Sequence, residues 1–502
     1  MKKYDMVVIG AGVGLTLVEA AVRKNLTCAL IEQSKFGGTC LTRGCIPSKM
    51  LVYPADVIRE AARAKKIGLE YKPAKVSWAR IAQRMWQEIG QSTQIENSLK
   101  SIDGLNVYNG QAEFAGHKTL RVRYNDGSYS DEFTGDKIII AAGARSFIPS
   151  IEGLNDTGFV TSESFFGEEF PKKPWKSLLI IGGGAIGAEF AHIFSALGTK
   201  VTIAELGSRL LAVEEEEISA FIMNHFKNNG IRVLTNAKMI MARKAGRRKS
   251  ATFEDTDKGG RYKIEADEIF VCAGREPNSD SLKMDSAGIQ TDKRGWIITD
   301  QYLKTSYENV WALGDINGKY PFRHKANFEA EVLVNNLFDE GDQRAVDYSH
   351  VPWAIYTWPQ VAHAGMTEQE ALRSGRRIMI GTNHYSKIAG GIAMGYSDQD
   401  QDNGFFKLIV DEEAKIIGAH IVGPNAAVLL QPFVYLMNAR QKCDIRKIEQ
   451  HAKEDAYSSK FESIRKMCPE SGTYWPIFRS MVIHPSLSEL TAWVIGKLRW
   501  SG

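Results

Sequence analysis

With 502 residues, 44% of them apolar, the chain is long enough for about three or four domains, each with its own core. Its 63 basic and 59 acidic residues leave a formal net charge of +4, a balance too even for a nucleic-acid-binding protein. Six cysteines in so long a chain exclude a small disulfide-stapled secreted scaffold and favour a reducing, cytoplasmic setting. No uncharged apolar run reaches the roughly 18 residues that a membrane-spanning helix needs.

The first residues predict a strand, a tight turn and a helix. An apolar run, YDMVVI, precedes Gly10, Gly12 and Gly14, and the next apolar strand, CALIEQ, ends at Glu32. An acid about 20 residues beyond the glycines completes a dinucleotide-binding fingerprint, in which the glycines approach a pyrophosphate and the acid accepts from a ribose hydroxyl. Leu15 stands where the third glycine is expected, so a purely structural glycine turn stays an alternative.

The same segment has a second alternative, a signal peptide, because two lysines precede its apolar run. Asp5, Glu19 and the glycine spacing do not suit a signal peptide and favour the strand, turn and helix. We therefore expect this segment to be part of the folded protein.

Two cysteines, Cys40 and Cys45, follow in the run FGGTCLTRGCIPSK. A disulfide that is made and broken in every turnover needs a short loop, one sulfur open to attack and the other close to an electron acceptor. Directly after a dinucleotide fingerprint, the pair predicts a redox-active disulfide linked to a flavin. The alternative is half of a metal site, but no second Cys or His cluster at ligand spacing completes it, so we expect no metal.

A second and complete fingerprint lies further along the chain, in the run SLLIIGGGAIGAEFAHIF. It supplies Gly182, Gly184 and Gly187, and the strand VTIAE ends at Glu205. An acid there accepts hydrogen bonds from both ribose hydroxyls of NAD and repels the 2′-phosphate of NADP. Arg209, four residues further on, is the one feature that argues against this preference for NAD. Two fingerprints in one chain predict two dinucleotides, and FAD beside NAD is the chemically sensible combination.

With these two sites around CLTRGC, the chain resembles the class I flavin-dependent pyridine nucleotide-disulfide oxidoreductases, the family of dihydrolipoamide dehydrogenase, glutathione reductase, mycothione reductase and mercuric reductase. The resemblance covers nearly the whole length. It implies an α/β fold with two Rossmann-like dinucleotide-binding domains and a C-terminal α+β dimerisation domain. Further matching runs are IIIAAGAR with Gly143, VCAGREPN with Gly274, NVWALGDING, RHKANFEAE, YTWPQVAHAGMTE, IIGAHIVGPNA and HPSLSE. Gly143 and Gly274 are expected to belong to the cofactor-binding residues.

The resemblance also implies a role for individual residues. Cys40 would be the interchange thiol that exchanges with the substrate, and Cys45 the thiolate that lies against the flavin and passes electrons to it. Asp315 would hydrogen-bond the ribityl chain of the flavin. Lys49 would pair with Glu189 beside the isoalloxazine ring.

Near the C-terminus, the run HPSLSE holds His484 and Glu489. A dithiol attacks a disulfide as a thiolate, so a base that titrates near neutrality is needed, and imidazole supplies it when a carboxylate fixes its tautomer. We predict that His484 and Glu489 form this dyad, and the resemblance implies that it serves the disulfide of the other subunit of a homodimer. The alternative is a helix capping box from Ser486 to Glu489, with His484 at the surface, and both can hold.

The matching runs divide the chain into three predicted domains. An FAD-binding domain takes residues 1–150 and 276–350, an NAD-binding domain takes 151–275, and an interface domain takes 351–502. Within the last, residues 451–480 look like an insertion, whose aromatic residues either reshape the substrate entrance or form a small extra core.

We predict first an NAD-dependent dihydrolipoamide dehydrogenase, which passes electrons from a dithiol through Cys40 and Cys45 and FAD to NAD. Gln360 and Val428 stand where this enzyme has acids and Ala330 where it has glycine, and several runs look more like mycothione reductase. One alternative is therefore an NADH-dependent reductase of another small disulfide. Another is a component acting chiefly within a multienzyme assembly, with a protein-bound lipoyl group as partner.

Overall fold

The structure is a computed structural model that describes the chain apart from residues 73–74, 339–342, 440–471, 475–476, 478–486 and 501–502. It has the mixed α/β fold that the sequence predicts, and its residues form two compact units. The first unit comprises Met1–Ile58, Pro73–Ser208 and Gly230–Tyr348. The second unit comprises Arg59–Lys72, Arg209–Asn229 and Ser349–Gly502.

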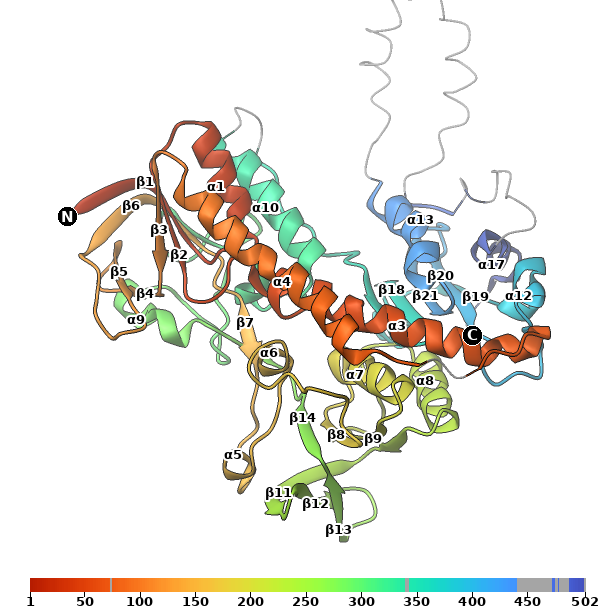
Figure 1. The fold of residues 1–502 in the computed structure, drawn as a ribbon. Helices are drawn as coiled ribbons and strands as arrows, with labels where there is room; N and C mark the ends of the chain where they lie inside the picture. The colour runs from red at the N-terminus through yellow and green to blue at the C-terminus, as the bar shows by residue number, and fades with distance from the viewer. Residues whose placement is uncertain (73–74, 339–342, 440–471, 475–476, 478–486, 501–502) are drawn as a thin grey trace, which may run out of the picture. The chain divides into compact units, whose positions relative to one another are not determined.

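The first unit contains a seven-stranded sheet of order β3-β2-β1-β6-β5-β4, in which β16 also pairs with β6. The parallel strands are β1 (Lys2–Ile9), β2 (Cys28–Glu32), β3 (Leu105–Asn109), β6 (Phe133–Ile140) and β16 (Val310–Ala312). The antiparallel hairpin is formed by β4 (Gln111–Phe114) and β5 (Thr119–Arg123). The helices that pack on one face are α1 (Gly14–Arg23), α4 (Trp78–Lys100) and α10 (Arg323–Phe338) (Figure 1).

Strand β1 is buried on both faces, which accounts for its unbroken apolar run. Val7 and Ile9 belong to the core on one face of the sheet. Met6 and Val8 belong to the core on the other face, together with α1 and α10. Side chains alternate along a strand, so a parallel sheet covered on both faces needs apolar residues at every position.

A second parallel sheet in this unit has the order β10-β9-β8-β14. Its strands are β8 (Ser177–Ile181), β9 (Lys200–Ala204), β10 (Arg232–Leu234) and β14 (Glu268–Val271), and α7 (Ala185–Ala196) connects β8 to β9. An antiparallel sheet follows, with β11 (Ala237–Ala245), β12 (Arg248–Asp255) and β13 (Arg261–Ala266). The smaller elements are β7 (Ala144–Ser146), β15 (Arg275–Pro277), α5 (Leu154–Thr157), α6 (Ser162–Phe165), η2 (Asp280–Leu282), α9 (Met284–Ala287) and η3 (Gly314–Asn317).

The second unit is built on a six-stranded antiparallel sheet of order β17-β18-β21-β20-β19-β22. Its strands are β17 (Trp353–Ile355), β18 (Gln360–Gly365), β19 (Ile378–His384), β20 (Phe405–Asp411), β21 (Ile416–Gly423) and β22 (Arg499–Trp500). Its helices are α8 (Glu216–Asn228), α11 (Glu368–Arg373), α12 (Ala389–Ala393), α13 (Ala426–Asn438) and α17 (Ser488–Ala492), with the short η1 (Ala64–Ile67), η4 (Tyr385–Lys387) and η5 (Trp493–Lys497). Helix α3 (Cys45–Arg63) begins in the first unit and ends in the second.

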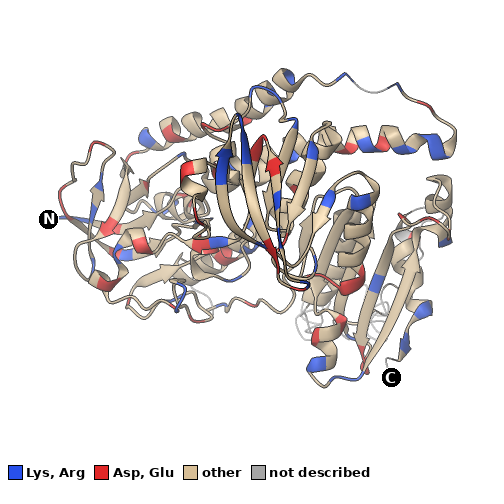
Figure 2. Ribbon diagram, turned by 90° about the horizontal axis from the view of Figure 1, so that it is seen from below, with Lys and Arg blue, Asp and Glu red and all other residues tan. Residues whose placement is uncertain are grey.

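Basic and acidic residues are interspersed along the helices and strands (Figure 2). This mixture agrees with the nearly even charge balance of the sequence. Within the part of the chain that the structure describes, no helix has both the length and the apolar composition needed to cross a membrane.

Candidate functional site

The first glycine loop connects β1 to α1. Gly10 has a φ of 106°, and a Cβ there would lie 2.3 Å from the carbonyl oxygen of Ala141, so only glycine fits. Glu32, at the end of β2, accepts hydrogen bonds from the N–H of Ala11 at 2.7 Å and from the N–H of Ser34 at 2.8 Å. Burial raises the pKa of Glu32, and these two N–H groups oppose the rise. Glu32 thus contacts the glycine loop between β1 and α1, as the sequence predicts.

Gly14 allows the close packing of helix on strand for which the fingerprint normally has a glycine at the position of Leu15. Helix α1 begins at Gly14, and a Cβ there would lie 2.7 Å from Cγ1 of Val8 on β1. The third glycine of a dinucleotide fingerprint allows this close contact of helix and strand. The departure at Leu15 is therefore compensated one position earlier.

The second glycine loop connects β8 to α7 in the same manner. Gly182 has a φ of 106°, and a Cβ there would lie 2.4 Å from the carbonyl oxygen of Cys272. Helix α7 begins directly after Gly184. A Cβ at Gly187 would lie 2.1 Å from the carbonyl oxygen of Gly182, so all three glycines have the environment that the complete fingerprint predicts.

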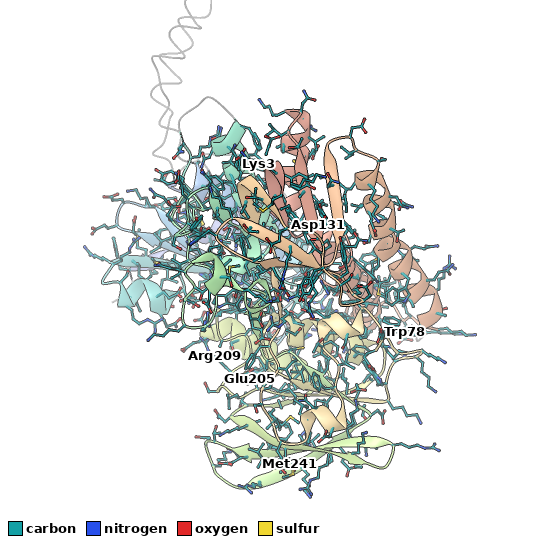
Figure 3. All side chains as sticks on the ribbon, turned by 90° about the vertical axis from the view of Figure 1, so that its left-hand side faces the viewer. Lys3, Trp78, Asp131, Glu205, Arg209 and Met241 are labelled. Carbon is teal, nitrogen blue, oxygen red and sulfur yellow. The ribbon has the colours of Figure 1, made fainter. Side chains whose placement is uncertain are left out.

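Glu205, labelled in Figure 3, directly follows β9. Its carboxylate accepts hydrogen bonds from the N–H of Gly183 at 2.6 Å and from the N–H of Gly207 at 2.7 Å. Glu32 and Glu205 therefore have equivalent places in two separate nucleotide-type loops.

The two loops fit dinucleotides. Gly184 lies directly before α7 and Gly12 lies two residues before α1, and the N–H groups at the start of a helix suit a pyrophosphate. Gly143 follows β6 and Gly274 follows β14, both with positive φ. At Gly143, Gly184 and Gly274 a Cβ would meet nothing within 4 Å, so the protein leaves space beside the backbone at the carboxyl ends of the parallel strands.

The two cysteines lie next to the first glycine loop. Cys40 is in the short helix α2 (Gly38–Thr42), and Cys45 is the first residue of α3. Gly38, which begins α2, has a φ of 67°, and a Cβ there would lie 2.5 Å from Cα of Gly12. Glycine before the cysteines thus lets the backbone of the Cys40 segment touch the backbone of the loop.

The two sulfurs form a hydrogen-bonded thiol pair. The Cys45 thiol donates to Cys40 and thereby lowers the pKa of Cys40 to about 7, against the effect of burial and with help from the positive charges of Arg323 and Lys49. The same hydrogen bond raises the pKa of Cys45. Cys40 is half-buried and Cys45 is exposed, so reagents can reach the pair. The pair therefore holds a thiolate near neutral pH, the form that reacts with disulfides.

Lys49 and Glu189 meet as the resemblance implies. Nζ of Lys49, one turn after Cys45 on α3, lies 2.7 Å from Oε2 of Glu189 on α7. A second contact between the same helices joins Nε2 of His192 to Oδ1 of Asp56 at 2.7 Å. The predicted contact is confirmed, and two pairs hold the cysteine-bearing helix against the helix of the second nucleotide loop.

Asp315 lies on η3, a turn that is anchored from α10. Glu329 accepts hydrogen bonds from the N–H of Gly314 at 2.7 Å and from Nδ2 of Asn317 at 2.7 Å. The buried Lys325 donates to the Gly314 carbonyl at 3.0 Å and pairs with Glu329 at 3.2 Å. This network fixes the turn on which the Asp315 carboxylate is presented.

Two arginines near these residues were not predicted from the sequence. The positive charge of Arg323 lowers the pKa of Cys40, and Nη2 of Arg275 lies 3.6 Å from Oδ2 of Asp315. Both belong to runs that match the family, RHKANFEAE and VCAGREPN, but nothing in their spacing connects them with the cysteines or with Asp315.

The predicted base can be located only in part. Glu489 lies on α17 and is fully buried. His484, Ser486 and nearly all of the predicted insertion at 451–480 lie outside the described residues. The dyad, its capping-box alternative and the role of the insertion therefore stay predictions.

Comparison with known proteins identifies matches along most of the chain. Residues 4–330 match the family described as "Pyridine nucleotide-disulphide oxidoreductase", and residues 351–452 match its dimerisation domain. The chain is similar to mycothione reductase of Mycobacterium tuberculosis, with 32% identity over 451 residues that cover 87% of this chain and 93% of that protein. It is also similar to dihydrolipoyl dehydrogenase of Chlamydia pneumoniae, with 32% identity over 442 residues that cover 86% and 89%.

A solved structure resembles the chain over its full length. It is the HOCl-induced flavoprotein disulfide reductase RclA of Escherichia coli, described as a Cu(II) complex. The TM-score is 0.81 and the sequence identity is 27%, over 99% of this chain and 99% of that one.

Proposed function

The chain belongs to the pyridine nucleotide-disulphide oxidoreductase family, whose members bind FAD and a pyridine nucleotide, and we propose that it is an NAD-dependent dihydrolipoamide dehydrogenase. The observation that carries the proposal is the thiol pair of Cys40 and Cys45, seated against the first glycine loop at the start of α3. A two-electron carrier in this place connects a dithiol with a nucleotide cofactor.

Each cofactor has its own set of residues. The loop of Gly10, Gly12 and Gly14 with Glu32 would hold FAD, with Asp315 at the ribityl chain and Gly143 and Gly274 leaving backbone space. The loop of Gly182, Gly184 and Gly187 with Glu205 would hold NAD. When bound, FAD accepts an electron pair from thiols and exchanges hydride with a nicotinamide.

The thiol chemistry is carried by the chain itself. One substrate thiolate attacks the sulfur of Cys40 in the oxidised pair, which breaks the S–S bond and releases Cys45 as a thiolate. The second substrate thiol, deprotonated by the proposed base His484 with Glu489, attacks the mixed disulfide and releases Cys40. The substrate leaves as a disulfide, and its two electrons stay on the cysteine pair. Lys49 and Arg323 stabilise the negative charge that collects there.

The nucleotide preference is proposed from Glu205. Its carboxylate is fixed by two backbone N–H groups at the end of β9, where it would meet the ribose of the nucleotide. Arg209, the opposing sign in the sequence, donates to the carbonyl oxygens of Ala212 and Glu214, at 2.8 and 3.1 Å. Because this guanidinium hydrogen-bonds within its own loop, we do not expect it to bind a 2′-phosphate. We therefore expect NADH and not NADPH to be the working nucleotide.

A second candidate is an NADH-dependent reductase of another small disulfide. Two observations favour it: the likeness to RclA covers 99% of both chains, and the identity with mycothione reductase equals that with dihydrolipoyl dehydrogenase. A homodimer is supported for both candidates by the match to the dimerisation domain. A protein-bound lipoyl group, within a multienzyme assembly, stays the proposed partner for the first candidate only.

The deciding experiment is an anaerobic titration of the purified protein with dihydrolipoamide, followed through the visible flavin spectrum. We expect a long-wavelength thiolate-to-flavin band, and then rapid NADH formation when NAD is added but little NADPH formation with NADP. A Cys45→Ser variant is the control, because it should keep FAD and lose disulfide turnover. Reduction by NADH without any response to dihydrolipoamide would refute the first candidate and turn the search to other disulfides.

A further inference from the structure

A cluster of two histidines and one glutamate lies in the core of the second unit, and the proposed redox chemistry does not use it. His363 on β18 lies directly opposite His420 on β21 in the antiparallel register. Glu214, just before α8, joins them, and all three are at most 1% exposed. One donor atom from each lies within 4.8 Å of the other two.

Backbone carbonyls fix the tautomers of both rings. Nε2 of His363 lies 2.8 Å from the carbonyl oxygen of Gly365, and Nε2 of His420 lies 2.8 Å from that of Met366. A carbonyl oxygen only accepts, so each Nε2 carries a hydrogen, and Nδ1 is left on each ring as the atom that can take a proton or a metal ion. This is the arrangement typical of metal-binding histidines, which donate their second N–H to a carbonyl or carboxylate.

The two Nδ1 atoms are the open positions of the cluster. Nδ1 of His363 lies 3.0 Å from Oε2 of Glu214, so two acceptors face each other unless a proton or a cation lies between them. Nδ1 of His420 is buried and has no hydrogen-bond partner among the described residues. Buried polar atoms without partners are rare and call for a ligand or a functional reason.

A tryptophan outside the cluster holds the Glu214 carboxylate in place, and the nearby lysine pairs with other acids. Nε1 of Trp353 donates to Oε1 of Glu214 at 2.6 Å, and the Trp353 ring stacks on His363 with centroids 3.8 Å apart. The nearby buried cation, Lys407, pairs instead with Glu215, Glu217 and Glu368. A buried carboxylate is stable when a proton or a cation balances its charge.

We propose that Glu214, His363 and His420 bind one divalent transition-metal ion of the Zn(II) type. Two imidazoles and a carboxylate are a donor set that such ions prefer. Ligand bonds of about 2.0–2.2 Å place tetrahedral donors about 3.3–3.6 Å apart. The His363–Glu214 distance of 3.0 Å is already close to this value, and separations of up to 4.8 Å would have to close by at most about 1.5 Å. The ion would connect the segment before α8 with β18 and β21. This inference is independent of the proposed dithiol substrate.

The test is metal retention by the oxidised holoenzyme, in which Cys40 and Cys45 form a disulfide and offer no thiolate to the metal. The protein is loaded with Zn(II), desalted in the presence of a weak chelator and analysed by mass spectrometry for metal. We expect about one Zn per chain in the wild type and less than about one tenth in His363→Gln and His420→Gln, a loss of at least tenfold. His384→Gln, a change of another histidine in the second unit, should keep the metal.

Electron paramagnetic resonance of the protein loaded with Cu(II) adds a readout of the ligands themselves. We expect nitrogen couplings from two imidazoles in the wild type and from one in either histidine variant. Absence of stoichiometric Zn in the wild type, or equal Zn in the wild type and both variants, overturns the proposal and leaves a proton shared by His363 and Glu214. Flavin absorbance and circular dichroism check folding, and Glu214→Gln replaces any histidine variant that does not fold.

Discussion

Replacing Cys45 with alanine is expected to change the acidity of Cys40 more than any other single substitution near it. The hydrogen bond from Cys45 is the largest of the effects that lower the pKa of Cys40 to about 7 from its ordinary 9.0. Without this donor, burial opposes only the weaker effects of Arg323, the backbone N–H of Ile46 and Lys49, so the pKa should return to about 9. At pH 7 the thiolate fraction then falls from about one half to about one hundredth, a loss of roughly 50-fold.

The assay is alkylation of the anaerobically reduced holoenzyme by iodoacetamide, with the Cys40 peptide followed by mass spectrometry. Thiolate is the reactive form, so the rate should rise with pH through about 7 in the wild type and through about 9 in Cys45→Ala. Cys28→Ala, which removes a buried cysteine elsewhere in the sheet, should leave the wild-type profile unchanged. Equal midpoints in the wild type and Cys45→Ala would show that the thiol pair does not set the acidity of Cys40.

Three further substitutions test the remaining parts of the site. Lys49→Gln removes the cation that pairs with the Glu189 carboxylate beside the cysteines. We expect kcat for dithiol oxidation, measured by stopped-flow kinetics, to fall about 10- to 100-fold. Flavin absorbance should show that FAD is retained. Gly38→Ala places a Cβ against the first glycine loop, so we expect it to abolish stoichiometric FAD binding. The control is Gly127→Ala, which is also at positive φ but in open space. It should keep FAD and lower the free energy of unfolding by only about 1 kcal/mol in denaturant titrations. Glu205→Ala removes the acid that would reject a 2′-phosphate, so the ratio of kcat/KM for NADPH to that for NADH should rise at least about tenfold; an unchanged ratio would contradict the assigned role.

The two nucleotide loops were predictable because their signals are local. A buried strand, a glycine turn, a helix and a distal acid follow one another within a short stretch, and each has a distinct residue requirement. Glu32 and Glu205 lie where this order places them. The compensation of Leu15 by Gly14 was not predictable, because it depends on how closely α1 approaches Val8.

The cysteine pair could be singled out from the sequence as a candidate redox site, but its electrostatics could not be predicted. Cys40 and Cys45 stand out through their spacing and their place after the first fingerprint. The pKa of Cys40 depends on the hydrogen bond from Cys45 and on the charge of Arg323, which belongs to a distant part of the chain. The contact of Lys49 with Glu189 was available only through the resemblance to a known family, since no pattern in the residues connects α3 with α7.

By itself the sequence determined the two nucleotide loops, the cysteine pair and the family, because short-range spacing encodes each of them. Only the tertiary structure decided the environment of Glu214, which belongs to a run of four acids at the start of α8. Such a run has the same pattern whether an acid faces water or the core. Glu214 is buried because strands β17, β18 and β21 bring Trp353, His363 and His420 around it, and pairing between segments so far apart in the chain leaves no periodic signal.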